Sequence, residues 1–406
     1  MGSRKSELRG WIEKLAEKRD GPLKRVRPMS SGQVASETKR DYQKLVASLA
    51  EQVSHSLDGH EIITSVVEHP DSNAWAFRNA FGDDLTSVVL VTNELIDRMQ
   101  SISTGSSAAA LRCLNSPKCP TEFLNIWSSL PKDKPHAVAF GRLMAHVTMV
   151  LLLNHEFAHI VIGHKFGGAT HADWGDDSDH VDQDDGCCAG SSLGILFWYL
   201  ARSPGNYKSQ SLELDADYHA ILWTKDYLDR FNINSPSLND IGPEDKLVTA
   251  TLMGEGYSKR FVLIAASWAL FLVLGGEQLD PKKFSDGTHP QVGIRLSLMA
   301  HAECQLEEQR NKCAPTMHGA AAFGALIGSF SLVGQPTVPQ IFDLLGFQSA
   351  LQNWKSVVEH AEILAKVRLE QERTLKGRRI KSGLPKAIWW AEAAEGVHGS
   401  SGVSHI

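Results

Sequence analysis

LLLNHEFAHIVIGH, residues 151–164, is the stretch from which the rest of the chain can be interpreted. It contains an HExxH pattern made by His155, Glu156 and His159. Neither Gly nor Pro occurs within 143–162, and apolar residues lie on both sides of the pattern, so the stretch predicts one buried helix. Positions i and i+4 share a face of a helix, so the two imidazoles are expected to converge on one point.

Such a histidine pair can ligate Zn²⁺, with Glu156 beside the open coordination position as a general base. Short patterns also recur by chance, and buried histidines are usually satisfied core residues, so the pattern alone leaves both interpretations open. A glutamate on a buried helix costs free energy unless it is paired or close to a metal ion. This setting favours the metal site.

A catalytic zinc site needs a third protein ligand and keeps its fourth position open. The segment LELDADYHA, residues 212–220, offers carboxylates on one predicted helix. Glu213 and Asp217 are four apart and share a face. We therefore predict Glu213 as the third ligand and Asp217 as the acceptor for the second N–H of a ligand histidine. Asp215 lies on another face and is expected to be solvated, and His219 is expected to be structural.

Size and composition indicate a globular protein with a large core and room for two or three domains. The chain has 406 residues, of which 42% are hydrophobic and 22% charged. Its net charge of −6 argues against nucleic acid as the main partner. Basic runs within the first 40 residues and at 366–386 are interpreted as solvated faces or tails. The six cysteines form no CxxC and no secretory signal opens the sequence, which predicts a reducing, cytoplasmic location.

One apolar segment allows a membrane-associated alternative. Residues 261–276, FVLIAASWALFLVLGG, carry no charge. A membrane span needs about 20 apolar residues, and this run is shorter, so we interpret it as a buried core helix.

The remaining chain predicts helices around a small sheet. Residues 6–20 and 36–57 are expected to be amphipathic helices, and 62–67, 73–77 and 87–92 strands. We interpret 102–135 and the acidic stretch 167–190 as insertions, and expect the Gly/Ala-rich 317–333 to pack closely against a neighbour. The predicted organisation is a helical N-terminal appendage (1–57), a catalytic domain (58–310) and a helical C-terminal region with a flexible tail (311–406).

HEFAH followed by ELDAD resembles the gluzincin metallopeptidases, and most of all the family of the HtpX heat-shock protease and the CAAX prenyl endopeptidase. Three further features agree. Residues 66–77, VVEHPDSNAWAF, are similar to that family's NAFA strand. His164 stands where many members carry another histidine, and Thr288-His289-Pro290 with Arg295 resembles a downstream S/T-H-P…R signature.

This resemblance implies an α+β, predominantly helical, zincin-like domain with a small sheet flanking the HExxH helix. It implies a zinc endopeptidase with one Zn²⁺ per chain and a protein or peptide substrate. His289 or Arg295 is the candidate donor to the oxyanion, although Arg295 pairing with a carboxylate is an equal alternative. The edge strand is expected to align the substrate through main-chain hydrogen bonds. Its candidate residues are Asn73, Ala74, Trp75 and Ala76, with burial of Trp75 in the core as an alternative.

Two other functions are compatible with the same residues. A non-catalytic, zinc-stabilised scaffold would need the histidines but not Glu156. A membrane-anchored quality-control protease would use 261–276 as its anchor. The sequence does not predict the oligomeric state, and the two insertions leave the cleavage preference open.

Overall fold

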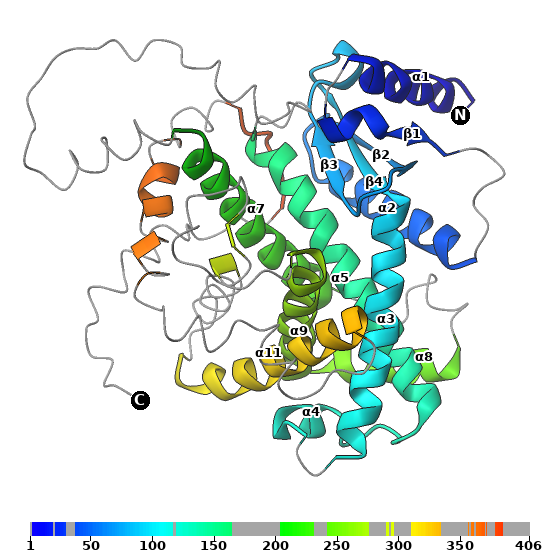
Figure 1. The fold of residues 1–406 in the computed structure, drawn as a ribbon, viewed down its shortest axis with the longest axis vertical. Helices are drawn as coiled ribbons and strands as arrows, with labels where there is room; N and C mark the ends of the chain where they lie inside the picture. Colours follow the sequence, from blue (N-terminus) through cyan, green and yellow to red (C-terminus); the bar gives the residue numbers. More distant parts are fainter. Residues whose placement is uncertain are drawn as a thin grey trace, which may run out of the picture.

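The computed structural model describes residues 2–18, 21–29, 37–116, 119–164, 204–230, 242–275, 290–291, 294–295, 310–333 and short stretches between 356 and 384. These residues are mostly helical, with a small mixed sheet of four strands, as the α+β prediction required (Figure 1). The acidic stretch 167–190 and His289 lie outside the described residues.

The sheet has strand order β1-β2-β4-β3. Strands β2 and β4 are parallel, with Glu61 opposite Thr86, while β1 and β3 pair antiparallel at the two edges. Every residue of β4 is buried, as expected for a central strand rich in Val and Leu. The strands are β1 (Arg27–Pro28), β2 (Glu61–Glu68), β3 (Ala74–Phe77) and β4 (Thr86–Thr92).

Helices cover both faces of this sheet, because successive side chains of β4 point to opposite sides. Val89 and Val91 face the main core, which they share with helix α2 (Glu37–His55). Val88 and Leu90 face a smaller core that includes residues of helix α1 (Gly2–Lys18). Figure 1 shows α1 on the outer side of the sheet. The two predicted N-terminal helices are thus present, and they pack on the sheet rather than standing apart from it.

Much of the segment 102–135, which we interpret as an insertion, is helical. Helix α3 (Asn93–Leu114) runs far into this segment, and a short helix, α4 (Thr121–Ile126), follows it. The Ser, Gly and Ala residues of α3 hide its helical pattern because they serve close packing. A Cβ placed on Gly141 of the neighbouring helix would overlap backbone and side-chain atoms of α3.

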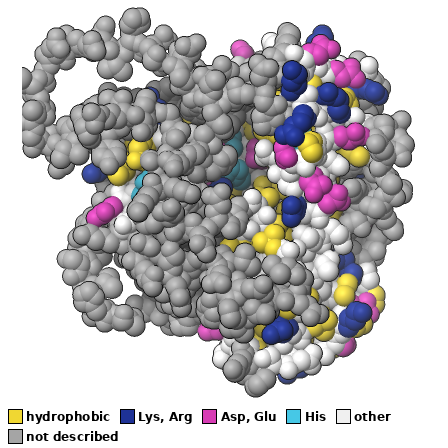
Figure 2. Space-filling view, viewed as in Figure 1, with side chains coloured by type: hydrophobic (Ala, Val, Ile, Leu, Met, Phe, Trp, Pro, Cys, Tyr) yellow, Lys and Arg dark blue, Asp and Glu magenta, His cyan; other side chains and the backbone are white. Residues whose placement is uncertain are grey.

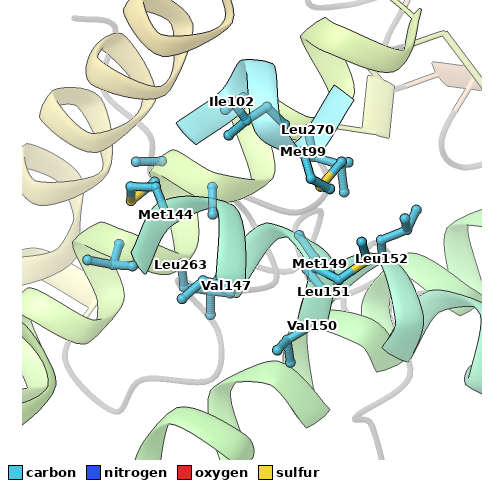
Figure 3. Packing of buried hydrophobic residues seen from close by; sticks show 14 of the residues in the cluster. Met99, Ile102, Met144, Val147, Met149, Val150, Leu151, Leu152, Leu263 and Leu270 are labelled. Atoms are coloured by element: carbon cyan, nitrogen blue, oxygen red, sulfur yellow. The ribbon is translucent and has the colours of Figure 1, made fainter. Parts of the chain in front are cut away.

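Helix α5 (Lys134–Ile162) carries the HExxH pattern and forms the centre of the molecule, as a single buried helix as predicted. The side chain of Asp133 caps its start by accepting a hydrogen bond from the backbone N–H of His136. Its end is set by Gly163, whose φ of 92° lies in the left-handed region. Figure 3 shows residues 147 and 149–152 of α5 packed among apolar side chains from α3 and α9 (Gly256–Gly275).

The second half of the described chain surrounds α5 with helices. Helix α11 approaches α9 closely at Gly324, where an added Cβ would lie 2.5 Å from the carbonyl oxygen of Ala265. The close packing predicted for the Gly/Ala-rich segment is therefore confirmed. The helices are α7 (Pro204–Asp229), α8 (Pro243–Gly254), α9 (Gly256–Gly275) and α11 (Arg310–Val333).

Two helices among the described residues are long and apolar enough to cross a membrane, judged by length and composition: α5 and Gly256–Leu274. In each, 78% of the most apolar window is buried inside the protein. All side chains from 261 to 273 are buried, in agreement with the predicted core helix. On the face shown in Figure 2, positive and negative side chains are interspersed over the described surface.

Candidate metal centre

Helices α5 and α7 bring together His155, His159 and Glu213. The two histidine Nε2 atoms lie 3.0 Å apart. The Glu213 carboxylate reaches both of them, with Oε2 3.3 Å from Nε2 of His155 and Oε1 3.6 Å from Nε2 of His159. The side chains are almost fully buried, from 11% exposed for His155 to 2% for Glu213. The juxtaposition predicted from the sequence is therefore present.

These three residues fit a zinc ion in both chemistry and spacing. Two imidazole nitrogens and one carboxylate oxygen are a common donor set for catalytic zinc. Around a tetrahedral Zn²⁺ with bonds of about 2.0–2.1 Å, donor atoms stand about 3.3–3.4 Å from one another. The two Nε2 atoms are 3.0 Å apart, one Glu213 oxygen lies 3.3 Å from His155 and the other lies 3.6 Å from His159, so all three distances are close to that value. A single ion can thus be held with little side-chain movement.

Glu156 is buried next to this cluster, with a relative exposure of 9%. Burial raises the pKa of its carboxyl to about 7, and the charge of Glu213 adds to the rise. The charges of His155 and Arg295 act in the opposite direction. Glu156 therefore lies within electrostatic range of the donor set without belonging to it.

The second nitrogen of His155 faces Asp217, as the spacing on α7 predicts. Its Nδ1 lies 2.9 Å from Oδ1 of Asp217. Arg295 donates to both oxygens of the same carboxylate, from Nε at 2.7 Å and from Nη2 at 2.6 Å. Burial alone would raise the pKa of Asp217, but the charge of Arg295 and the hydrogen bond with His155 hold it below its usual value.

Arg295 thus pairs with a carboxylate, which was one of the two alternatives for this residue. Its guanidinium also lies 4.2 Å from the centroid of the Phe271 ring, a cation–π contact. Because Asp217 engages two of its donor groups, we assign Arg295 to holding Asp217 rather than to an oxyanion. Pro290 and residues 294–295 are described, and the N–H of Arg295 bonds to the carbonyl of Gln291 in a helical turn.

The second nitrogen of His159 faces His164, whose Nδ1 lies 2.7 Å from Nδ1 of His159. Nε2 of His164 lies 3.4 Å from Oδ2 of Asp215, and Arg368 donates from Nη2 to that same oxygen at 2.7 Å. We call these four residues the His159 network. Burial lowers the pKa of His164 to about 4. Burial alone would raise the pKa of Asp215, but the charge of Arg368, the hydrogen bond with His164 and the nearby histidines together lower it.

Two predictions are corrected by this network. Asp215 is only 2% exposed, so it is not solvated: α7 is enclosed on several sides, and the face turned away from the donor set meets other parts of the protein. Arg368 belongs to the basic run 366–386 that we interpreted as solvated, yet it is fully buried. Its sequence neighbours carry no signal that would have singled it out. His219 lies off the donor set, as expected, with Nδ1 2.8 Å from the carbonyl oxygen of Asp215.

Strand β3 forms one edge of the described sheet and contacts α5. Ala74 and Ala76 face the main core, whereas Trp75 lies on the side of the sheet that α1 covers. Trp75 is half-buried and packs edge-to-face on His69, with ring centroids 5.2 Å apart. Asn73 is exposed at the start of the strand, where its carbonyl accepts from the backbone N–H of Thr92.

The chain was compared with protein-family models, curated proteins and solved structures, and none of them matches it.

Proposed function

We propose that this protein is a zinc-dependent endopeptidase of the HtpX-like type, with a zincin-like catalytic domain. The observation that carries the proposal is the meeting of Glu213 from α7 with the Nε2 atoms of His155 and His159 from α5. Glu156, buried beside them, adds the group that a purely structural zinc site does not need.

The chemistry follows from the roles that these side chains can take. A zinc ion held by His155, His159 and Glu213 supplies a Lewis acid that acidifies water and polarises a carbonyl. Glu156 accepts the proton of the attacking water and passes it to the leaving amine, a contribution typically of about 10²–10⁴ in rate. Asp217 keeps the proton of His155 on Nδ1, so that the lone pair of Nε2 stays available to bind the metal.

The edge strand β3 is our candidate for the substrate-aligning element. An extended peptide can add to a sheet edge by main-chain hydrogen bonds, and β3 is the edge strand next to α5. Within 73–76, Asn73 is the exposed residue. The side chain of Trp75 points to the α1 side, so it is a packing residue in this proposal rather than the wall of a pocket.

The decisive test compares purified wild type with Glu156→Gln, and with Glu51→Gln as a matched exposed control. Zinc content is measured by mass spectrometry and cleavage with a fluorescently labelled unfolded protein. We expect about one zinc per chain in all three proteins. Glu156→Gln should cleave at least about 100-fold more slowly, because it lacks the general base.

Three outcomes would contradict the proposal. A wild-type protein that binds no zinc would exclude the proposed metal site. Zinc binding with undiminished cleavage by Glu156→Gln would exclude the mechanism. Zinc binding with no cleavage by any of the three proteins would favour the non-catalytic scaffold. Cell fractionation without detergent tests the membrane-associated alternative separately.

A further inference from the structure

The His159 network ends on a buried ion pair between Asp215, which is close in sequence to Glu213, and Arg368, which is far from the donor set in sequence. Asp215 and Arg368 are 2% and 0% exposed, and their contact is 2.7 Å. Removing two charges from water is costly, and apolar residues of similar volume often stabilise a core equally well. A buried pair is therefore weak evidence for a role in stability. Its position at the end of a chain of polar contacts suggests another role.

The order of contacts fixes where the protons lie. Nε2 of His159 faces Glu213, so a metal there requires the proton of His159 to be on Nδ1. That N–H then donates to Nδ1 of His164. His164 must carry its own proton on Nε2, which faces the carboxylate of Asp215. These tautomers are assigned from the contacts, and only this assignment gives each atom a compatible partner.

The two ligand histidines are therefore supported in parallel ways. His155 contacts Asp217, whose carboxylate pairs with Arg295. His159 contacts His164, which contacts Asp215, whose carboxylate pairs with Arg368. Asp215 and Asp217 stand two residues apart on α7, and each receives one arginine from a later part of the chain. Side chains that orient a ligand histidine contribute strongly to metal affinity.

We propose that Arg368 is a positioning residue of the metal site, acting through Asp215 and His164 on His159. The C-terminal segment is then part of the centre and not an appendage to it. This inference rests on the proposed zinc site. Two further contacts hold the segment on α7 without touching the network: Ser211 donates to Gln371 at 2.9 Å, and His360 lies 3.0 Å from Gln210.

The test uses the full-length protein and the variants Arg368→Gln, Arg368→Lys and Asp215→Asn. Gln371→Ala is the matched control, because it removes a contact between the same two segments outside the network. The first readout is zinc affinity, by competition with a chromophoric chelator. The second is the visible spectrum of the Co²⁺-loaded protein, which reports ligand geometry and which a merely structural role would not change.

We expect Arg368→Gln and Asp215→Asn to bind zinc about 10- to 100-fold more weakly and to alter the Co²⁺ spectrum. Arg368→Lys should recover part of the affinity because it keeps the charge, and Gln371→Ala should match wild type. Wild-type affinity and spectrum in both Arg368→Gln and Asp215→Asn would overturn the inference and leave the proposed function intact. Wild type without zinc would overturn both.

If Arg368→Gln does not fold, ¹⁵N NMR of the imidazoles in the zinc-loaded wild type tests the proposed tautomers instead. A proton on Nε2 of His164 supports the network as assigned. A proton on Nδ1 of His164 would overturn it, because His159 could then not donate to that atom.

Discussion

Asp215 and Asp217 show how two similar residues on one helix acquire separate partners. A side chain two positions along a helix points to a different face. Asp217 meets His155, whereas Asp215 meets His164 and Arg368. The spacing of four from Glu213 predicted the position of Asp217 because it depends only on helix geometry. It did not predict that of Asp215, because that depends on what encloses the other face.

Replacing Asp217 by Asn tests its proposed effect on His155. The amide keeps the size of the side chain but loses a charge that faces both Nδ1 of His155 and the guanidinium of Arg295. We expect zinc affinity to fall about 10- to 100-fold, measured by chelator competition. Asp229→Asn is the control, since Asp229 is on the same helix but exposed and paired with Lys225. Equal affinities in the two variants would show that Asp217 does not support the metal.

His146 is expected to make stability fall in acid. Burial lowers its pKa to about 4, and its Nε2 lies 2.9 Å from the hydroxyl of Tyr227. As the pH falls from about 6.5 to about 4, the unfolded chain takes up a proton that the folded protein does not. The free energy of unfolding therefore decreases over this window by up to about 1.4 kcal/mol per pH unit, and above it this contribution is absent.

Urea unfolding of wild type and His146→Gln between pH 7 and pH 4.5 measures this effect. The variant should lose less stability than wild type over that range. Release of metal in acid affects both proteins, so it cancels in the difference between them. Parallel stability curves would refute the role of His146.

At the level of elements, small residues decide how the helices approach one another. α11 approaches α9 closely at Gly324 and Gly328, and an added Cβ at Gly328 would lie 3.0 Å from Cβ of Leu272. A run of Gly and Ala in the sequence predicts such close packing directly. The Ser-rich part of α3 also packs closely, at Gly141 of α5. Its polar residues resemble those of a loop, which is why the extension of this helix beyond residue 101 was not predicted.

Gly324→Ala is expected to destabilise the protein by about 1–3 kcal/mol, because the new methyl meets a backbone oxygen that cannot move freely. Gly10→Ala is the matched control in α1, where nothing lies within 4 Å of the added Cβ. It should stabilise by about 0.5–1 kcal/mol through the better helix propensity of Ala. Thermal or urea unfolding measures both, and a neutral Gly324→Ala would argue against the tight contact.

At the level of the whole molecule, local signals predicted more than distant ones. The α5 helix follows from an unbroken apolar run, and β4 from a cluster of β-branched residues. The meeting of His155 with Glu213 was predictable because each lies on a helix with a defined face. The part played by Arg368 was not, because a contact between residues so far apart leaves no periodic trace in the sequence.

Zinc is expected to stabilise the whole fold, since the donor set joins α5 to α7. A ligand that binds only the native state adds about 4 kcal/mol at a thousandfold excess over its dissociation constant. Chelator treatment should therefore lower the melting temperature of wild type, and added zinc should restore it. Glu213→Gln should show a much smaller response. A wild-type melting temperature that zinc does not change would refute this predicted stabilisation.

The contact between Arg368 and Asp215 also has a consequence for how the protein is made. A ribosome delivers the chain from its N-terminus, so α5 and α7 emerge well before Arg368 has been synthesised. Until then the carboxylate of Asp215 lacks the guanidinium of Arg368, and burying it unpaired would cost more free energy than leaving it in water. The chain of contacts behind His159 is thus completed only after Arg368 has been synthesised.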